Sequence, residues 1–161
     1  MNLFTRQDGT VHGGKVAAWA TIATVLVAGF EGYSGHVYRD AVGVKTICYG
    51  QTGNDGADFS KVYSKAECEQ MLGVDLQKYD AMVHSCIKVP LPPHREAALV
   101  SFTYNLGQGA LCHGAVAWNL NRGNVADGCW AMLSYNHAGG RVLDGLTRRR
   151  KAEYKLCMEN D

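Results

Sequence analysis

Apolar side chains recur at helical intervals near the start of the chain. Trp19, Ile22, Leu26 and Phe30 follow one another at three- or four-residue spacing, which is typical of a helix with one buried face. They lie in residues 16–30, a segment of fifteen residues without a charge. At ~1.5 Å per residue this helix is about 22 Å long, short of the roughly 30 Å hydrocarbon core of a bilayer. A helix of the folded protein is therefore one interpretation of the segment.

Two other interpretations of residues 16–30 stay open. A cleaved signal peptide fits the length, with the small residues 27–29 as a cleavage site, but cleavage there leaves Glu31 almost at a free terminus. The weak apolarity also suits a marginal membrane anchor, because burying small side chains releases little transfer free energy and lets the segment leave again. Arg6 and Lys15 before it would keep the N-terminus in the cytoplasm and place the rest across the membrane.

The middle of the chain predicts a small sheet followed by a long helix. Glycines 32 and 35 should end the first helix, and residues 38–50 are rich in β-branched side chains and punctuated by glycine, as strands and turns are. Residues 51–56 continue as turns. Ser64 and Glu67 have the S-x-x-E spacing of a capping box, which opens a helix that runs through Val83.

Helices are predicted for most of the remaining chain. Pro93 is placed to open a helix that ends at Leu106, because proline suits the first turn and glycines 107 and 109 follow. Further helices are predicted over 111–121, 124–135 and 146–158, with a break at 138–140. We therefore expect an α+β fold, with a small N-terminal sheet lobe and a larger helical lobe joined by the helix that begins near Ser64.

Composition limits the classes of partner. A chain of 161 residues that is 47% hydrophobic is expected to form one compact domain. Its net charge of +1 supplies no long-range field for a polyanion, so we expect no nucleic acid partner. The one basic run, residues 147–151, is interpreted as a solvated helix face, with an anionic polymer or lipid as the alternative.

Cysteine and histidine spacing argues against a metal. The six cysteines include no CxxC pair, which indicates disulfides and export to an oxidising compartment, with buried free thiols as the alternative. The six histidines are scattered along the chain, so we expect no metal ligands. No nucleotide, zinc-protease or serine-hydrolase motif occurs, and no cofactor is expected.

Two carboxylates flank the predicted sheet. Glu31 ends an apolar helix, where partial desolvation favours the protonated form that a general acid needs. Asp40 lies beside Arg39 in a polar turn and should stay ionised. Glycoside hydrolysis uses one carboxyl of each kind, and the hydroxyl of Thr46 on the adjoining strand can help to hold a water. Because exposed acidic residues are common, chemistry alone leaves this assignment open.

The spacing around these residues resembles a known family. Glu31, eight residues, Asp40, five residues and Thr46 resemble the catalytic segment of the phage T4-type lysozymes, the endolysins of glycoside hydrolase family 24. The strings SFTYNLGQG at 101–109 and GLTRRRKAE at 145–153 are similar to two further segments of that family.

The resemblance implies a lysozyme-like fold and a muramidase that cuts the β-1,4 bond between N-acetylmuramic acid and N-acetylglucosamine in peptidoglycan. It implies Glu31 as general acid, and Asp40 with Thr46 as the groups that position or activate water. The implied catalytic domain is 31–161, with a β lobe of about 31–62 and a helical lobe of about 63–161, preceded by an N-terminal tail and weakly hydrophobic helix at 1–30.

The resemblance also implies roles outside the catalytic group. Gln51, Thr52, Tyr104 and Asn105 resemble positions that line the sugar groove, although each can instead be structural, and Gln51 stands where many relatives carry histidine. The cysteine arrangement is similar to that of exported members. The implied disulfides are Cys48 with Cys68, Cys86 with Cys112, and Cys129 with Cys157.

Residues 16–30 resemble the signal-anchor-release segment of a membrane-exported subset of these endolysins. This implies a monomer that is first tethered to the inner membrane and then acts in the host periplasm; the alternative is residence in the host cytoplasm until a holin opens. Two other functions remain: a lytic transglycosylase, and a peptidoglycan-binding module without catalysis.

Overall fold

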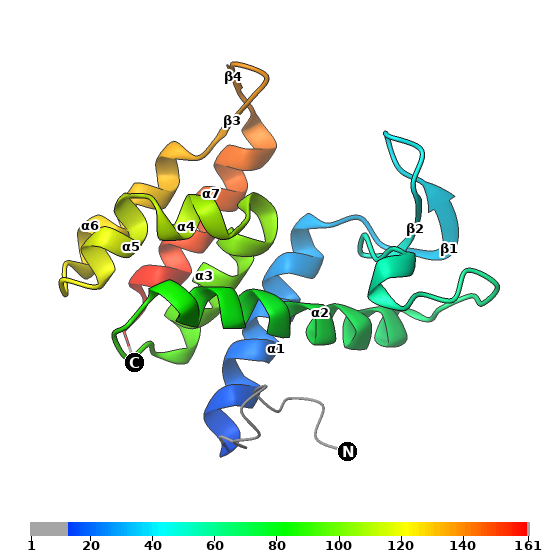
Figure 1. Ribbon diagram of the computed structural model, residues 1–161, viewed down its shortest axis with the longest axis horizontal. Coiled ribbons are helices and arrows are strands. Elements are labelled where there is room, and N and C mark those ends of the chain that lie inside the picture. The colour runs from blue at the N-terminus through cyan, green and yellow to red at the C-terminus, as the bar shows by residue number, and fades with distance from the viewer. Residues whose placement is uncertain (1–12, 161) are drawn as a thin grey trace.

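The computed structural model describes residues 13–160, with a small sheet lobe beside a larger helical lobe (Figure 1). The N-terminal tail up to residue 12, including Arg6, lies outside the described residues. The elements are α1 (Gly13–Phe30), β1 (Ser34–Arg39), β2 (Lys45–Cys48), η1 (Gly53–Asp55), α2 (Lys65–Cys86), α3 (Pro93–Leu106), α4 (Gln108–Cys112), α5 (Ala115–Leu120), α6 (Val125–Ala131), η2 (Met132–Ser134), β3 (His137–Ala138), β4 (Arg141–Val142) and α7 (Asp144–Met158). This is the α+β arrangement expected from the sequence.

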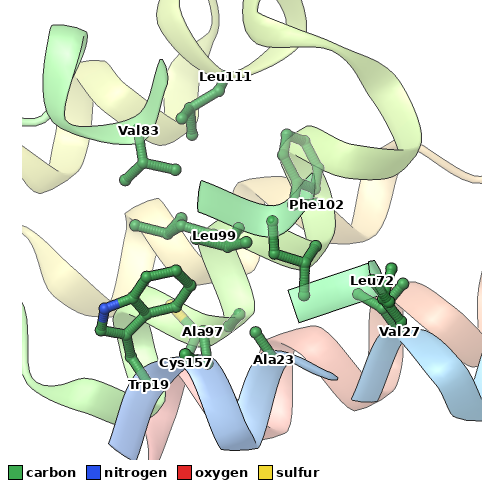
Figure 2. Packing of buried hydrophobic residues seen from close by; sticks show 14 of the residues in the cluster. Trp19, Ala23, Val27, Leu72, Val83, Ala97, Leu99, Phe102, Leu111 and Cys157 are labelled. Carbon is green, nitrogen blue, oxygen red and sulfur yellow. The ribbon is translucent and has the colours of Figure 1, made fainter. Parts of the chain in front are cut away.

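Helix α1 belongs to the core of the helical lobe. Trp19, Ala23 and Val27 are fully buried and face labelled residues of α2 and α3, including Leu72 and Leu99 (Figure 2). Burying such side chains contributes roughly 1.5–3 kcal/mol for each large apolar residue. Among residues 13–160, no helix is both long and apolar enough to cross a membrane.

Helix α2 joins the two lobes and begins where the capping box predicts. The Ser64 side chain accepts from the Glu67 amide at 3.2 Å, and the Glu67 carboxylate accepts from the Ser64 amide at 2.8 Å. Two backbone donors at the helix start are thereby satisfied. In Figure 1, α2 runs from below the β1–β2 sheet into the helical lobe, so it supports both lobes.

The sheet lobe is built on one antiparallel hairpin. Strands β1 and β2 pair with Tyr38 opposite Thr46 and Ser34 opposite Cys48, with an irregularity between these two pairs. The connecting turn contains Gly43 at φ +84°, a left-handed conformation that glycine adopts without strain. The hairpin therefore presents the residues of its turn, Asp40 among them, at its tip.

The predicted helix 111–121 is divided in two. Helix α4 ends at Cys112 and α5 begins at Ala115, with Gly114 as its N-cap, while Gly109 lies inside α4. A Cβ atom on Gly114 would lie 2.6 Å from the Tyr135 hydroxyl oxygen and 2.9 Å from the Ala110 carbonyl oxygen, so the close approach at this break requires glycine.

The predicted helix 124–135 is shorter than expected. It ends at Ala131 and continues as the 3₁₀ turn η2. The predicted break at 138–140 lies at the turn of a second hairpin, formed by β3 and β4, which the sequence did not predict because each strand has only two residues. Two glycines with positive φ, at 139 and 140, make this turn.

All six cysteines are paired. The disulfides are Cys48–Cys68, Cys86–Cys112 and Cys129–Cys157, with Cα–Cα distances of 5.0, 5.5 and 5.8 Å. These are the pairs that the resemblance implied. The first links the sheet lobe to α2, the second links α2 to α4, and the third links α6 to α7, so each ties together segments distant in sequence.

Candidate active site

Glu31 lies at the end of the buried helix α1. Its amide donates to the Val27 carbonyl at 2.9 Å, so the backbone is still held as in the helix. Its side chain is 30% exposed and accepts a hydrogen bond at Oε1 from Arg149 Nη1 at 2.8 Å. The apolar helix before Glu31 predicts an apolar setting for this carboxyl, whereas the structure gives it a charged partner.

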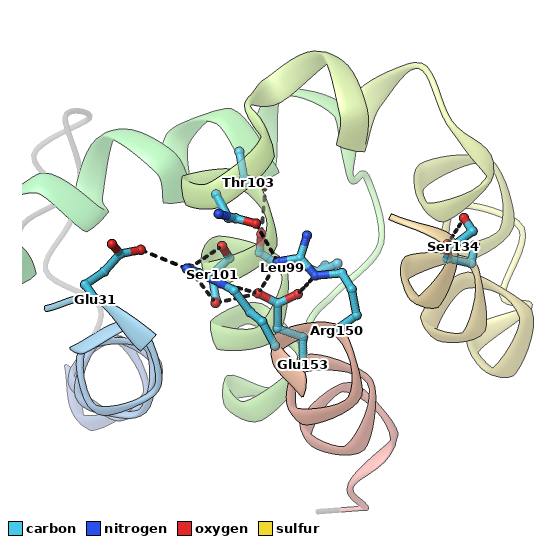
Figure 3. Close-up of polar contacts among 10 residues, drawn as sticks. Glu31, Leu99, Ser101, Thr103, Ser134, Arg150 and Glu153 are labelled. Atoms are coloured by element: carbon cyan, nitrogen blue, oxygen red, sulfur yellow. Dashed lines mark hydrogen bonds and ion pairs between the residues drawn. The ribbon is translucent and has the colours of Figure 1, made fainter. Parts of the chain in front are cut away.

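Arg149 is held by a buried network on α7 and α3. Its Nε lies 3.2 Å from Glu153 Oε1, and its Nη2 donates to the Ser101 carbonyl oxygen at 3.3 Å. The Ser101 hydroxyl donates to Glu153 at 2.7 Å, and Arg150 Nε lies 2.8 Å from Glu153 Oε2. Figure 3 shows Glu31 at one end of this row of contacts, with Ser101, Glu153 and Arg150 beyond it.

Burial gives this network its electrostatic character. Burial raises the pKa of the Glu153 carboxyl, and its contacts with Arg150, Ser101 and Arg149 offset part of that rise. Burial likewise lowers the pKa of the Arg150 guanidinium, while Glu153 acts in the opposite direction. A buried charge is tolerated when it is paired and hydrogen-bonded, and each charge in this network has such a partner.

The interpretation of residues 147–151 as a solvated helix face is wrong for its two central arginines. Arg149 and Arg150 are buried because they face α3 and carry the contacts to Glu31 and Glu153. Sequence reasoning assigned no catalytic-site role to either arginine. One sequence signal could have identified them. Arg149 and Arg150 lie four and three residues before Glu153, a spacing at which side chains on a helix form ion pairs.

Asp40 occupies the turn of the β1–β2 hairpin. Its Oδ1 accepts from the amides of Val42 at 3.0 Å and Val44 at 2.9 Å. Its own amide donates to the Val44 carbonyl at 3.0 Å. Within the described residues no hydrogen bond ends on its second carboxylate oxygen, Oδ2. The turn thus orients the carboxylate through one oxygen and leaves the other open.

Thr46 is connected to Asp40 through the backbone of Val44. The Thr46 hydroxyl donates to the Val44 carbonyl at 3.0 Å. The Val44 amide in turn donates to Asp40 Oδ1. Thr46 is only 3% exposed, and it pairs with Tyr38 one position away from the end of the strands at the turn. The structure therefore brings Asp40 and Thr46 into one hydrogen-bonded unit.

A pocket of about 440 Å³ opens beside Glu31. It is lined by the end of α1, by Asn105 of α3 and by the first turns of α7. Asn105 accepts from Arg150 Nη2 at 2.9 Å, which fixes the amide at the pocket wall. Of the four predicted substrate-binding residues, Asn105 is the one that shares this pocket with Glu31.

The other three candidates have structural contacts. Gln51 is 1% exposed, accepts from the Tyr49 amide at 2.8 Å and donates to Asp75 at 3.0 Å. The amide and hydroxyl of Thr52 both donate to Asp55, at 2.8 and 3.0 Å, which caps the turn η1. These contacts support the structural alternative for both residues.

Tyr104 links the two lobes next to Glu31. Its hydroxyl donates to the Tyr49 carbonyl, just after β2, at 3.1 Å. Burial raises the pKa of the Tyr104 phenol, and the nearby charge of Glu31 raises it further. Tyr104 therefore joins α3 to the segment just after β2 and is close enough to Glu31 to be affected by its charge.

Comparisons with known proteins cover the whole of this site. The model of the phage lysozyme family matches residues 28–153. The SAR-endolysins of Bacteriophage PS119 and Enterobacteria phage P21 are each 35% identical over 154 residues, which cover 92% of this chain and 89% and 90% of theirs. The SAR-endolysin of Pseudomonas phage phiKMV is 37% identical over 148 residues, 89% of each chain.

Solved structures show the same fold. A mutant of P22 lysozyme superposes with a TM-score of 0.78 at 28% identity, covering 85% of this chain and 95% of that chain. An endolysin from Escherichia coli O157:H7 phage FAHEc1 gives a TM-score of 0.75 at 30% identity, covering 86% and 91%. Glu31, Asp40, Thr46 and Arg149 all lie within the residues that the family model matches.

Proposed function

Because this chain belongs to the phage lysozyme family, we propose that Glu31, Asp40 and Thr46 are its catalytic residues. As an endolysin of this family it is a muramidase that hydrolyses the β-1,4 bond between N-acetylmuramic acid and N-acetylglucosamine in peptidoglycan and so lyses the host cell. The observation that carries the assignment of the acid is the position of Glu31 on a pocket wall, fixed by Arg149.

Glu31 is proposed as the general acid. Arg149 contacts Oε1, so we assign the proton to Oε2, which gives it to the leaving glycosidic oxygen as the bond to the anomeric carbon breaks. The amide of Asn105, which lines the same pocket, is proposed to bind the sugar beside Glu31. Holding the carboxyl by a buried arginine limits its rotation and so positions the proton.

Asp40 is proposed to orient and activate the attacking water. Its Oδ1 is fixed by two amides of the turn, so Oδ2 is the atom that accepts a proton from the water as it adds to the anomeric carbon. The Thr46 hydroxyl donates to Val44, and its lone pairs can accept a hydrogen from the same water. We retain Gln51, Thr52 and Tyr104 as residues that shape the groove.

Three variants test these roles on purified peptidoglycan. Glu31→Gln is expected to stay folded and to lose nearly all release of reducing ends, and Asp40→Asn to lose most of it. Glu159→Gln, an exposed change on the last turn of the chain, is the matched control and should keep full activity. Retained lysis of permeabilised cells by Glu31→Gln would refute the assignment.

The products separate this function from its two rivals. Hydrolysis adds water and gives reducing N-acetylmuramic acid ends, whereas a lytic transglycosylase leaves 1,6-anhydro ends and a binding module releases no sugar. Mass spectrometry of the soluble products is expected to show hydrated ends only. A spectrum dominated by 1,6-anhydro ends contradicts muramidase action while leaving Glu31 as an acid.

We further propose that residues 16–30 associate transiently with the inner membrane, from which the enzyme is released into the periplasm. The support is an uncharged segment and relatives named SAR-endolysins. In the folded protein Trp19, Ala23 and Val27 are buried in the core, so residues up to 30 do not form a separately packed unit. We propose that the boundary after residue 30 separates the segment that associates with the membrane from the catalytic segment.

Cell fractionation tests the proposed localisation. The full-length chain is expected first in the membrane fraction and, after membrane depolarisation, in the periplasmic fraction. Finding it only in the cytoplasm until a holin opens would instead support the cytoplasmic alternative. We propose that the released enzyme is a monomer, which light scattering coupled to size-exclusion chromatography measures directly.

A further inference from the structure

A second group of titratable side chains lies at the junction of α2 and α3, within the helical lobe. Asp80 and His84 are four residues apart on α2, so they lie on the same face of the helix. Glu96, in the first turn of α3, reaches the same point. Asp80 and Glu96 are 3% and 7% exposed, whereas the His84 side chain is 31% exposed. The group is therefore buried on its acidic side and open to solvent at the imidazole.

The possible ligand atoms of these residues converge. His84 Nε2 lies 2.6 Å from Glu96 Oε1 and 3.3 Å from Asp80 Oδ1. One nitrogen or oxygen from each residue lies within 4.8 Å of the other two. Asp80 Oδ1 is a buried atom that makes no hydrogen bond, with the His84 ring as its near contact. A buried oxygen in this condition costs free energy unless an ion or a donor compensates it.

We propose that Asp80, His84 and Glu96 form a binding site for a divalent transition-metal ion of the zinc class. Zinc binds imidazole nitrogen and carboxylate oxygen at about 2.0–2.2 Å, which places two ligands of a tetrahedral ion roughly 3.4 Å apart. The 3.3 Å separation of His84 Nε2 and Asp80 Oδ1 fits that geometry. Glu96 Oε1, now 2.6 Å from His84 Nε2, has to move away from that nitrogen by less than about 1 Å to reach the same separation. A water molecule would be the fourth ligand.

The charge of the group favours a doubly charged ion. Two buried carboxylates carry two negative charges when ionised, and a protonated His84 neutralises one of them. A divalent cation neutralises both and binds the neutral imidazole.

The site lies where an ion would act as a clamp. The α2 ligands are near the end of the helix that joins the lobes, and Glu96 is on the helix that carries Ser101, the partner of Arg149. A bound ion stabilises the folded protein because the three ligands are adjacent only after α2 packs against α3. This role is separate from the chemistry at Glu31 and does not depend on it.

Metal titration of the full-length, chelator-treated protein tests the site. ZnCl₂ at a hundred times its dissociation constant is expected to raise Tm by about 5–10 °C, and EDTA should reverse the shift. CoCl₂ should give visible d–d bands, which report coordination directly. All six cysteines are in disulfides, so thiols do not contribute to either signal.

Three variants complete the test. His84→Gln and Asp80→Asn are each expected to lose the zinc-induced Tm shift and the cobalt bands, whatever their own Tm. His113→Gln removes an exposed histidine outside the group and should keep both signals. No shift and no bands in the wild-type protein, or signals that survive in His84→Gln, would overturn the proposal and leave the group as a buried ion-pair cluster.

Discussion

Replacing Glu153 by glutamine tests the buried network that supports the proposed acid. Glu153 is fully buried and receives contacts from Ser101, Arg149 and Arg150 at 2.7–3.2 Å. Glutamine has nearly the same shape, so the change removes the negative charge and leaves little cavity. Two buried guanidinium groups then lack their shared counter-ion.

The expected loss of stability follows from that imbalance. Removing one partner of a buried ion pair costs about 3–5 kcal/mol, because the remaining charge is uncompensated. The glutamine oxygen still accepts one hydrogen bond and Arg149 still has Glu31, so we expect a loss of about 3 kcal/mol in the free energy of unfolding. For a chain of this size that corresponds to a fall in Tm of roughly 6–12 °C.

Urea unfolding followed by circular dichroism measures this loss, and reducing-end release measures the effect on catalysis. We expect activity to fall as well, since Arg149 loses a contact that orients it toward Glu31. Glu159→Gln, the exposed glutamate of the same chain end, should stay within about 0.5 kcal/mol of the wild type. A Glu153→Gln protein that loses less than about 1 kcal/mol would show that the network does not depend on this charge.

Two further predictions concern stability. Replacing Cys129 and Cys157 together by alanine removes a disulfide with a sequence separation of 28. We expect the free energy of unfolding, measured in urea, to fall by roughly 3.5 kcal/mol, because the unfolded chain gains conformational entropy. A loss near zero would contradict this reasoning. Lys61 and Ser64 lower the pKa of Glu67 to about 2. The ionised carboxylate therefore stabilises the folded protein above pH 4.5, and this stabilisation declines as the pH falls toward 2. The Tm advantage of the wild type over Glu67→Gln should therefore shrink across that range, and an advantage that grows instead contradicts the assignment.

Local signals in the sequence predicted much of the framework. The capping box at Ser64 and Glu67 predicts the start of α2 because both partners lie within one turn. The proline at position 93 predicts the start of α3 for the same local reason. Glu31 and Asp40 were proposed as catalytic residues because their spacing resembles that of the phage lysozymes. The structure places Glu31 just after helix α1 and Asp40 in a hairpin turn.

Contacts between distant segments were not predictable from pattern. Arg149 lies in a basic run that resembles an exposed face, and its burial depends on α3 and on Glu31, 118 residues earlier. His84 and Glu96 are twelve residues apart with a proline-rich turn between them, a spacing that matches no metal motif. Only the packing of α2 against α3 brings their side chains together, and so the scattered histidines gave no signal.

The 118-residue separation between Glu31 and Arg149 has a consequence for biosynthesis. A nascent chain delivers its acid first and the arginine that holds it almost last, after α6 and the β3–β4 hairpin. Premature termination before α7 removes both Arg149 and Glu153, and so leaves Glu31 without the side chain that holds it. The contact that fixes the proposed acid therefore forms only in a chain translated through its final helix.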